Sequence, residues 1–416
     1  MDFDKFNINI VNQNLMKNLC VLPFNSLSIL STGTLRACCG SGSGSFKANL
    51  NTSSDILNYE QIVDLRKAFL NNEKPAFCNR CWNTEALGAS SDRTSNLQHY
   101  KNFQHPENAL FQENIEFTNI QHIDIDLGNK CNLACRMCNP SCSTLVAGQY
   151  VKFKNPIIDI NHALKMSTVG NVLSENTKQR VLEVLEKTVN LEHVSMIGGE
   201  PLVIDFHDTI LEKIISLGMA SQVSVRISTN LQSDIERKLE LYSHFKKIEL
   251  SISVDGSGET YEYIRWPGKW QKIINNINTL KKHNETHKNI TYSFTTVVQN
   301  LNVDNLCDFI VEIKDFAMSE NSLYFHIVQR TNEIEILPKH VILEAIDKIK
   351  NYKSTYRQNL LNILNDALVK SDNLNPGKVK QFFNLQQEFD TLRGQNLFEL
   401  KPHFIELADT YNIPTW

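Results

Sequence analysis

The cysteines are the residues of this sequence whose type and spacing best indicate chemistry. Nine of the ten lie within the first 142 residues of the 416-residue chain, and only Cys307 follows them. Eight of them form two groups, Cys20, Cys38, Cys39, Cys78 and Cys81, then Cys131, Cys135 and Cys138. Because thiols stay reduced inside cells, clustered cysteines of an intracellular protein are more often metal ligands than disulfide partners. Both groups therefore predict metal sites.

The second group follows a predicted strand. Residues 122–127 alternate between polar and apolar side chains, which is typical of a strand, and a short turn at 128–130 follows. Three cysteines then come at the spacing C-x3-C-x2-C. Three thiolates on one loop can bind three irons of a [4Fe-4S] cubane and leave the fourth iron open to a ligand. A zinc knuckle on the same thiols is the alternative.

This loop resembles the cysteine loop of the radical S-adenosylmethionine (radical SAM) superfamily. The likeness rests on the spacing, on the preceding strand and on Asn132, Leu133 and Met137 between the cysteines. It implies a [4Fe-4S] cluster on Cys131, Cys135 and Cys138, with SAM at the open iron and Met137 in the SAM site. It further implies reductive cleavage of SAM to methionine and a 5'-deoxyadenosyl radical that abstracts hydrogen from a substrate. An external one-electron donor such as flavodoxin or ferredoxin is implied as well.

A second motif follows the next predicted strand. Residues 192–197 read as a strand and lead into Gly198, Gly199 and Glu200. Glycines let a backbone approach a ligand closely, and a carboxylate can bind an ammonium group. The motif resembles the GGE motif of the radical SAM superfamily, which implies that it binds the methionyl amino group of SAM.

Polar residues end the next two predicted strands, residues 221–231 and 247–257. They are Ser228, Thr229 and Asn230 on the first, and Ser251, Ser253 and Asp255 on the second. The three on the second strand share one side because strand side chains alternate. The resemblance implies ribose contacts here, and we assign Asn230 and Ser253 to them. For Thr229 and Ser251 an ordinary cap or turn role is equally open.

Two further residues complete the predicted SAM site. Arg265 follows a short helix, and the resemblance implies that its guanidinium pairs with the SAM carboxylate. A surface salt bridge is the alternative for this residue. The fifth predicted strand, 291–300, has an apolar end at Val297 and Val298, and we assign Val298 to the adenine.

The elements that position these residues predict an α/β fold. Residues 120–330 contain six predicted strands, the last at 322–329, that alternate with helices such as 176–189 and 269–282. Parallel strands joined by helices place ligands at the carboxyl ends of the strands, where these motifs lie. The resemblance implies a partial (β/α)6 TIM-like barrel. We predict a radical SAM core at 116–330, a cysteine-rich module at 1–115 and a helical C-terminal region at 331–416.

The first cysteine group resembles the twitch or SPASM module. Residues 27–38 predict a hairpin that turns at Gly33. Twelve residues separate Gly33 from Cys20 and four separate it from Cys38, and a C-x2-C pair follows later. The likeness implies one auxiliary [4Fe-4S] cluster on Cys20, Cys38, Cys78 and Cys81. A structural zinc on the same thiols is an alternative, as is Cys39 in place of Cys38. Cys142 and Cys307 are most simply spare thiols.

The rest of the chain carries no motif chemistry. Residues 341–353, 360–370 and 385–400 are helical in pattern, with a break at Pro376 and Gly377. His326 on the sixth predicted strand faces either a cavity or the core.

Composition narrows the function further. Lys and Arg number 42 against 46 Asp and Glu, so the chain has no strong signal for nucleic-acid binding. No stretch approaches the ~18 apolar residues of a membrane span, and the N-terminus lacks signal-peptide features. We expect a cytoplasmic enzyme without a membrane partner, acting on a peptide. A small carbohydrate or nucleoside-like substrate, and a non-catalytic metal-stabilised binding protein, are the alternatives.

Overall fold

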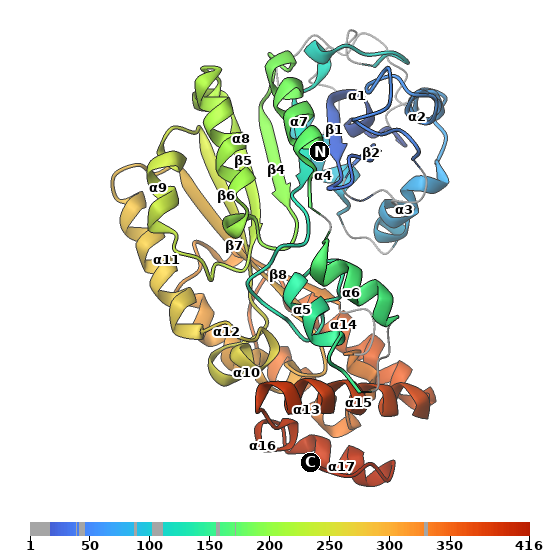
Figure 1. Cartoon of the computed structure of the whole chain (residues 1–416). Helices are drawn as coiled ribbons and strands as arrows, with labels where there is room; N and C mark the ends of the chain where they lie inside the picture. The colour runs from blue at the N-terminus through green and yellow to red at the C-terminus, as the bar shows by residue number, and fades with distance from the viewer. Residues whose placement is uncertain are drawn as a thin grey trace. The chain divides into compact units, whose positions relative to one another are not determined.

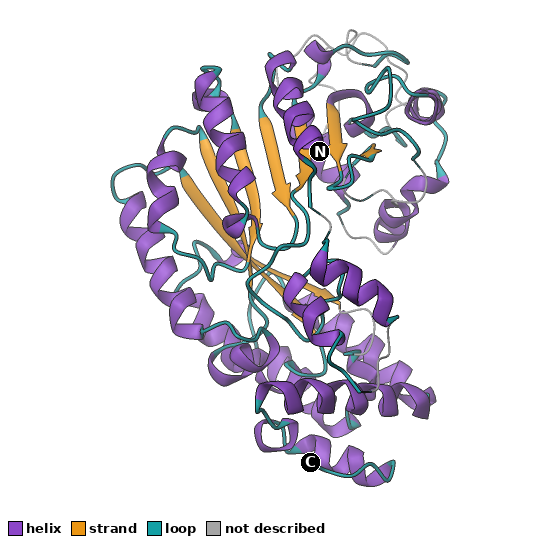
Figure 2. Ribbon diagram, viewed as in Figure 1, coloured by secondary structure: helices purple, strands orange, loops and turns teal. Residues whose placement is uncertain are grey.

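The computed structural model describes residues 17–38, 40, 46–86, 90–101, 111–154, 159–170, 172–327 and 332–416. Figure 1 traces the chain and Figure 2 distinguishes its helices and strands. The chain divides into two compact units. The first comprises Met1–Leu127, Val172–Ile197 and Asp208–Val225, and the second Gly128–Asn171, Gly198–His207 and Arg226–Trp416. Cys39 lies outside the described residues, so its alternative role as a ligand stays open.

A sheet of eight strands has the order β2-β1-β3-β4-β5-β6-β7-β8. The strands are β1 (Ser26–Ile29), β2 (Leu35–Arg36), β3 (His122–Asp126), β4 (His193–Ile197), β5 (Ser224–Thr229), β6 (Lys247–Ser253), β7 (Ile290–Val298) and β8 (Leu323–Ile327). From β3 to β8 the spatial order follows the chain order, as repeated strand–helix units produce. The predicted α/β class with a parallel sheet is confirmed.

Two strands of this sheet were not among the six predicted ones. The N-terminal hairpin forms as expected, with β1 antiparallel to β2 and Gly33 at a φ of +80° in the turn. In addition, β1 pairs in parallel with β3, so that Leu27 lies opposite Ile123. Parallel pairing between segments about ninety residues apart leaves no local pattern in the sequence, which is why the prediction kept the hairpin apart from the sheet.

Short helices surround the N-terminal cysteines in the first unit. The helices of this unit are α1 (Leu22–Asn25), α2 (Glu60–Leu70), the 3-10 turn Ala76–Cys78, α3 (Asn79–Ala86), α4 (Asp92–Lys101) and α7 (Glu175–Lys187). Helix α2 buries Ile62, Leu65 and Phe69 in one apolar cluster with Phe24. The buried Arg66 donates hydrogen bonds to the carbonyl oxygens of Pro23 and Leu57, which ties α2 to the neighbouring loops.

The second unit holds the remaining strands and most helices. Its helices are α5 (Thr144–Tyr150), α6 (Ile160–Thr168), α9 (Glu236–Ser243), α10 (Gly258–Ile264), α11 (Trp270–Asn284), α12 (Leu306–Lys314), α13 (Lys339–Lys350), α14 (Arg357–Lys370), α15 (Pro376–Arg393), α16 (Leu397–Leu400) and α17 (His403–Thr410). Helix α8 (Asp205–Ser216) and β5 pass from one unit to the other. Strands β6, β7 and β8 are parallel, with Ser253 opposite Thr295 and Val298 opposite Ile327.

The predicted C-terminal helices are present, with different ends for one of them. Helix α15 begins at Pro376, because proline suits the first turn of a helix, and ends at Arg393, where Gly394 caps it with a φ of +62°. The prediction instead began this helix at 385 and ran it on to 400. Asn396 then caps α16. Within the described ranges, no helix is both long and apolar enough to cross a membrane.

Candidate functional site

The loop that carries Cys131, Cys135 and Cys138 is fixed by its own backbone. The amide N–H of Ala134 donates to the carbonyl oxygen of Trp266 at 2.7 Å, and that of Arg136 donates to the carbonyl oxygen of Ile264 at 2.8 Å. Within the loop region, the Ser143 hydroxyl donates to the carbonyl oxygen of Leu133 at 2.6 Å. These bonds join the loop to the end of α10.

The Gly-Gly-Glu motif packs directly on this loop. The Gly199 amide donates to the Gly128 carbonyl oxygen at 2.6 Å, and the Glu200 amide donates to that of Lys130 at 2.9 Å. A Cβ atom on Gly199 would lie only 2.3 Å from the Lys130 carbonyl oxygen. Gly198 has a φ of +140°, which other residues rarely adopt. In this structure the close approach that Gly199 permits is to the cysteine loop.

Glu200 follows β4, and its buried carboxylate contacts the end of β5. Its Oε1 accepts hydrogen bonds from the Thr229 hydroxyl at 2.7 Å and the Leu202 amide at 3.1 Å, and its Oε2 accepts one from the Asn230 amide at 2.6 Å. Only 1% of the residue is exposed. Burial raises the pKa of Glu200 to about 7, although the three donors oppose this shift. A cation beside the carboxylate would favour its ionised form.

Asn230 connects this carboxylate to the cysteine loop. Its side-chain amide donates to Asn132 Oδ1 at 2.8 Å and lies 3.9 Å from the Cys131 sulfur. The Cys131 sulfur also accepts the Leu133 amide N–H at 3.4 Å. The structure therefore brings together the cysteine loop, the carboxylate and the end of β5, as the sequence predicted.

Arg265 contacts the loop at Cys135. Its Nε is 2.7 Å from Asp255 Oδ2, and its Nη1 is 3.7 Å from the Cys135 sulfur. Both charged residues are buried, so the alternative of a surface salt bridge is wrong for Arg265. The Asp255 carboxylate was grouped with possible ribose contacts, but here it pairs with Arg265.

Three other predicted site residues make no contact that tests their role. Ser253 is half-buried at the end of β6, Val298 is fully buried at the end of β7, and Met137 is half-buried in the cysteine loop. The Ser251 hydroxyl forms a hydrogen bond of 2.9 Å with that of Thr295. Their assignments to SAM stay predictions.

Without a bound metal, the three thiols of the loop favour their protonated form. Burial raises the pKa of Cys131 to about 12 and raises that of Cys135, while a hydrogen bond with Cys142 is the main cause of the raised pKa of Cys138. Each thiolate also disfavours its neighbours by charge repulsion. A bound metal reverses this balance because its ligands must be deprotonated. Three thiols without a harder ligand form a donor set that suits an iron–sulfur cluster.

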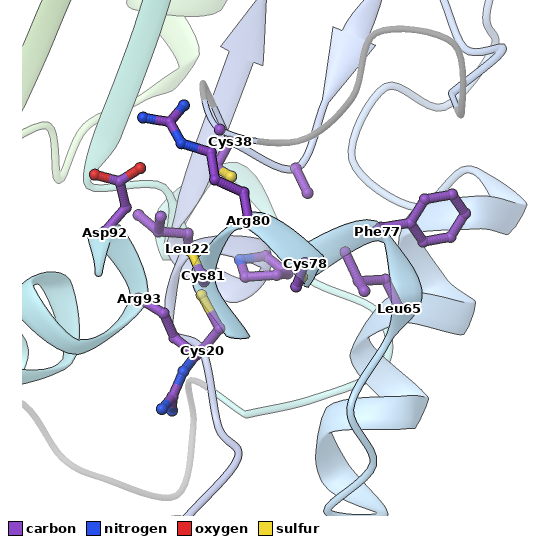
Figure 3. Close-up of a pocket in the computed structure, with 13 residues that line it drawn as sticks. Cys20, Leu22, Cys38, Leu65, Phe77, Cys78, Arg80, Cys81, Asp92 and Arg93 are labelled. Carbon is purple, nitrogen blue, oxygen red and sulfur yellow. The ribbon is translucent and has the colours of Figure 1, made fainter. Parts of the chain in front are cut away.

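A second set of thiols lines a pocket in the first unit. Cys20, Cys38, Cys78 and Cys81 share it with Leu22, Leu65, Phe77, Arg80, Asp92 and Arg93 (Figure 3). The empty space inside it is about 470 Å³, open solvent included. Burial raises the pKa of Cys78 to about 12. The four cysteines that the sequence selected thus lie together, although they come from α1, β2 and α3 and the segments beside them.

Among the described residues, no two cysteines form a disulfide with each other. Over the ranges that the structure describes, no group of three or more His, Cys, Asp or Glu side chains is arranged to hold a single metal ion.

Sequence reasoning missed a set of residues that contact the cysteine loop from α15. Gln386, Asp390 and Arg393 reach Arg136 or the loop backbone. Their spacing of four and three residues places them on one face of a helix. Polar residues that recur at this spacing among Phe382, Phe383 and Phe389 were the available signal.

Comparison with protein families gives one match. Residues 125–313 match the family model of the radical SAM superfamily. A search of curated proteins found no match. This match supports a radical SAM domain within residues 125–313.

Solved structures of radical SAM enzymes are similar to the chain at low identity. One is native anSMEcpe with bound AdoMet and the Kp18Cys peptide, with 15% identity and a TM-score of 0.36 over 55% of this chain and 59% of that one. Another is Streptococcus suis SuiB bound to precursor peptide SuiA, with 13% identity and a TM-score of 0.34 over 78% of this chain and 68% of that one. The chain spans about three fifths of the length of the first of these proteins.

Proposed function

We propose that the second unit binds a [4Fe-4S] cluster on Cys131, Cys135 and Cys138 and cleaves SAM beside it to abstract hydrogen from a substrate. The observation that supports this most is the position of the cysteine loop. The loop contacts Glu200 through the Lys130 carbonyl oxygen and Arg265 through the Cys135 sulfur, within one compact unit. The radical SAM domain supplies the family context.

The residues around the loop have separate roles in this proposal. Glu200 binds the methionyl ammonium group, and Arg265 binds the carboxylate with the guanidinium nitrogen that faces away from Asp255. Asn230 and Ser253 contact the ribose, while Val298 and Met137 cover the adenine. When bound, the cluster supplies the electron that cleaves SAM into methionine and a 5'-deoxyadenosyl radical. Burial of Glu200 and Arg265 excludes water, which strengthens their pairing with the two charged ends of SAM.

In the first unit, we propose an auxiliary [4Fe-4S] cluster on Cys20, Cys38, Cys78 and Cys81. Four thiols that line one pocket support this assignment. Four thiolates leave no iron open, so this site would carry electrons or order the substrate and would not cleave SAM. A structural zinc on the same thiols is the competing assignment.

The substrate that we propose is a peptide, taken from the likeness of the N-terminal cysteine pattern to modules found in peptide-modifying enzymes. Small carbohydrates and nucleoside-like molecules are the second class to test. The electron donor would be a flavodoxin or ferredoxin, as expected of a cytoplasmic enzyme.

The test is anaerobic reconstitution followed by reduction with dithionite in the presence of SAM. We expect 5'-deoxyadenosine and methionine in equal amounts. Replacing Cys131, Cys135 and Cys138 together by Ala should abolish both products, because three cluster ligands are lost. The matched control is Cys307→Ala, a cysteine outside both groups. Cleavage that survives in the triple variant would contradict the proposed site.

A further inference from the structure

Helix α15 joins the cysteine loop through a buried arginine. Arg136 lies between Cys135 and Cys138 and is 1% exposed. Its Nη1 donates to Gln386 Oε1 at 2.7 Å, and its Nη2 donates to Asp390 Oδ1 at 2.5 Å. A loop that carries predicted cluster ligands is therefore held by residues some 250 positions later in the chain.

Both oxygens of the Asp390 carboxylate accept hydrogen bonds. Its Oδ1 accepts a hydrogen bond from the Tyr263 hydroxyl at 3.0 Å in addition to the one from Arg136. Its Oδ2 accepts the Leu397 amide N–H at 2.7 Å and the Trp416 indole N–H at 3.0 Å. Because the carboxylate is buried and all its donors are fixed, it holds the Arg136 guanidinium in one position.

Arg393, three residues after Asp390, reaches the loop itself. Its Nη2 donates to the carbonyl oxygen of Ala134, the residue before Cys135, at 2.6 Å, and to Gln149 Oε1 at 2.7 Å. The guanidinium also lies over the rings of Phe389 and Trp266, with its central carbon 4.1 Å and 5.2 Å from the ring centroids. Arg393 is therefore fixed beside Cys135.

The charged side chains that join α15 to the cysteine loop carry a net positive charge. Arg136 and Arg393 bring two positive charges and Asp390 one negative charge, which leaves one positive charge. The charge of Arg265, by contrast, is matched by Asp255. Among the described residues, Arg393 forms no ion pair, and its buried Nε and Nη1 atoms have no hydrogen-bond partner. A buried charge without a partner is costly, so the site needs an anion next to Arg393.

We propose that α15 is a clamp that positions the cysteine loop through Arg136 and Asp390, and that Arg393 is a positioning residue whose charge stabilises negative charge at Cys135. The second part rests on the proposed function, since the negative charge is that of the thiolate-bound cluster. The C-terminal region thus takes part in the redox site. Arg393 would favour the reduced form, which is the more negative one.

The clamp is tested on the chain without any cluster. Hydrogen–deuterium exchange is measured for residues 131–138 in wild type, Asp390→Asn and Gln386→Met, with Arg357→Met as the control. Arg357 is an exposed arginine of α14. We expect faster exchange in this loop in the first two variants, and no change in the control. Gln386→Met is the milder change if Asp390→Asn does not fold. Wild-type exchange in the folded variants would overturn the clamp.

The role of the Arg393 charge is tested on the cluster-loaded chain. Arg393→Met keeps the apolar stem and removes the charge, Arg393→Lys keeps the charge, and Arg357→Met is again the control. The reduced fraction is read at a fixed potential from the electron paramagnetic resonance signal that SAM perturbs. We expect a reduced-to-oxidised ratio roughly ten-fold lower in Arg393→Met, about 59 mV for one electron, and a ratio near wild type in Arg393→Lys. Equal ratios in all four proteins would overturn this role.

The experiments distinguish a failure of the proposed function from a failure of the clamp. Wild-type protein that binds iron but gives no signal perturbed by SAM would overturn the proposed function, and the role of the Arg393 charge with it. The exchange experiment still decides the clamp in that case, because it needs no cluster.

Discussion

At the scale of single residues, the site depends on groups whose burial conflicts with their charge. Glu200 accepts three hydrogen bonds, yet burial still raises its pKa to about 7 from the ordinary value of 4.5. A carboxylate with a raised pKa in the folded chain is protonated at pH values where the unfolded chain has already lost the proton. Glu200 gains the negative charge that binds a cation only as the pH rises through its pKa in the folded chain.

This predicts a pH dependence of SAM binding. Between pH 5.5 and pH 7 the affinity should rise on the order of ten-fold, since the ionised fraction of Glu200 rises over this window. Equilibrium dialysis of the cluster-loaded protein measures it. Glu200→Gln should bind SAM more weakly by roughly ten-fold or more, which corresponds to ~1.4 kcal/mol for each factor of ten, and without this pH dependence. A flat wild-type profile would argue against the ammonium contact.

A second prediction concerns Gly199. A methyl group there would meet the Lys130 carbonyl oxygen, and neither backbone can move easily. Gly199→Ala should destabilise the fold by about 1–3 kcal/mol, as overpacking usually does. Gly148→Ala is the matched control: nothing lies near its added Cβ in helix α5, so it should stabilise by about 0.5–1 kcal/mol. Denaturant unfolding of both variants measures the difference, and equal stabilities would contradict the packing argument.

At the scale of elements, helix α15 does more than close the C-terminus. Its Leu385 and Phe389 pack with Val146 and Tyr150 of α5 in one apolar cluster. Gln386 and Asp390 bind Arg136 instead. Helix α15 therefore both packs in an apolar core and fixes the cysteine loop. A substitution that weakens this packing should also disturb the position of the loop.

Phe389→Ala tests this coupling. The side chain is fully buried, and Arg393 lies over its ring. We expect a loss of about 3–5 kcal/mol in the free energy of unfolding, typical of a truncated core aromatic, and a lower iron content after reconstitution. Ile405→Ala on α17 is the control, because Ile405 is 40% exposed. Wild-type iron content in a destabilised Phe389→Ala protein would show that packing and loop position are independent.

At the scale of the whole molecule, the two cysteine groups lie in different compact units. The proposed ligands also differ in number, with four cysteines in the first unit and three in the second. A chain with two four-iron clusters should hold about eight irons. Loss of one cluster should therefore leave the other in place.

Changing both Cys78 and Cys81 to Ala should remove about half the iron and abolish substrate turnover. Some uncoupled SAM cleavage should survive, because the loop of the second unit is untouched. Iron analysis and 5'-deoxyadenosine measurement test this, with Cys307→Ala as the control. The variant must first be shown to be compact, since a bound metal can contribute folding energy. Zinc in place of iron in protein purified without air would contradict the auxiliary cluster.

The sequence alone determined the elements and the local motifs. The period of apolar residues predicted strands β3 to β8 to within about two to four residues at each end, and the Gly33 turn predicted the hairpin, because both depend on near neighbours. The cysteine spacing and the Gly-Gly-Glu motif selected residues that do lie together, because ends of parallel strands meet at one edge.

Only the tertiary structure decided the contacts between distant segments. The parallel pairing of β1 with β3, the ion pair of Arg265 with Asp255 and the contact of Asp390 with Arg136 each join residues whose own surroundings in sequence look ordinary. Their partners are chosen by the packing of whole elements, which no local pattern records. A buried arginine and an exposed one read alike in a sequence, and the fold alone tells them apart by what surrounds each guanidinium.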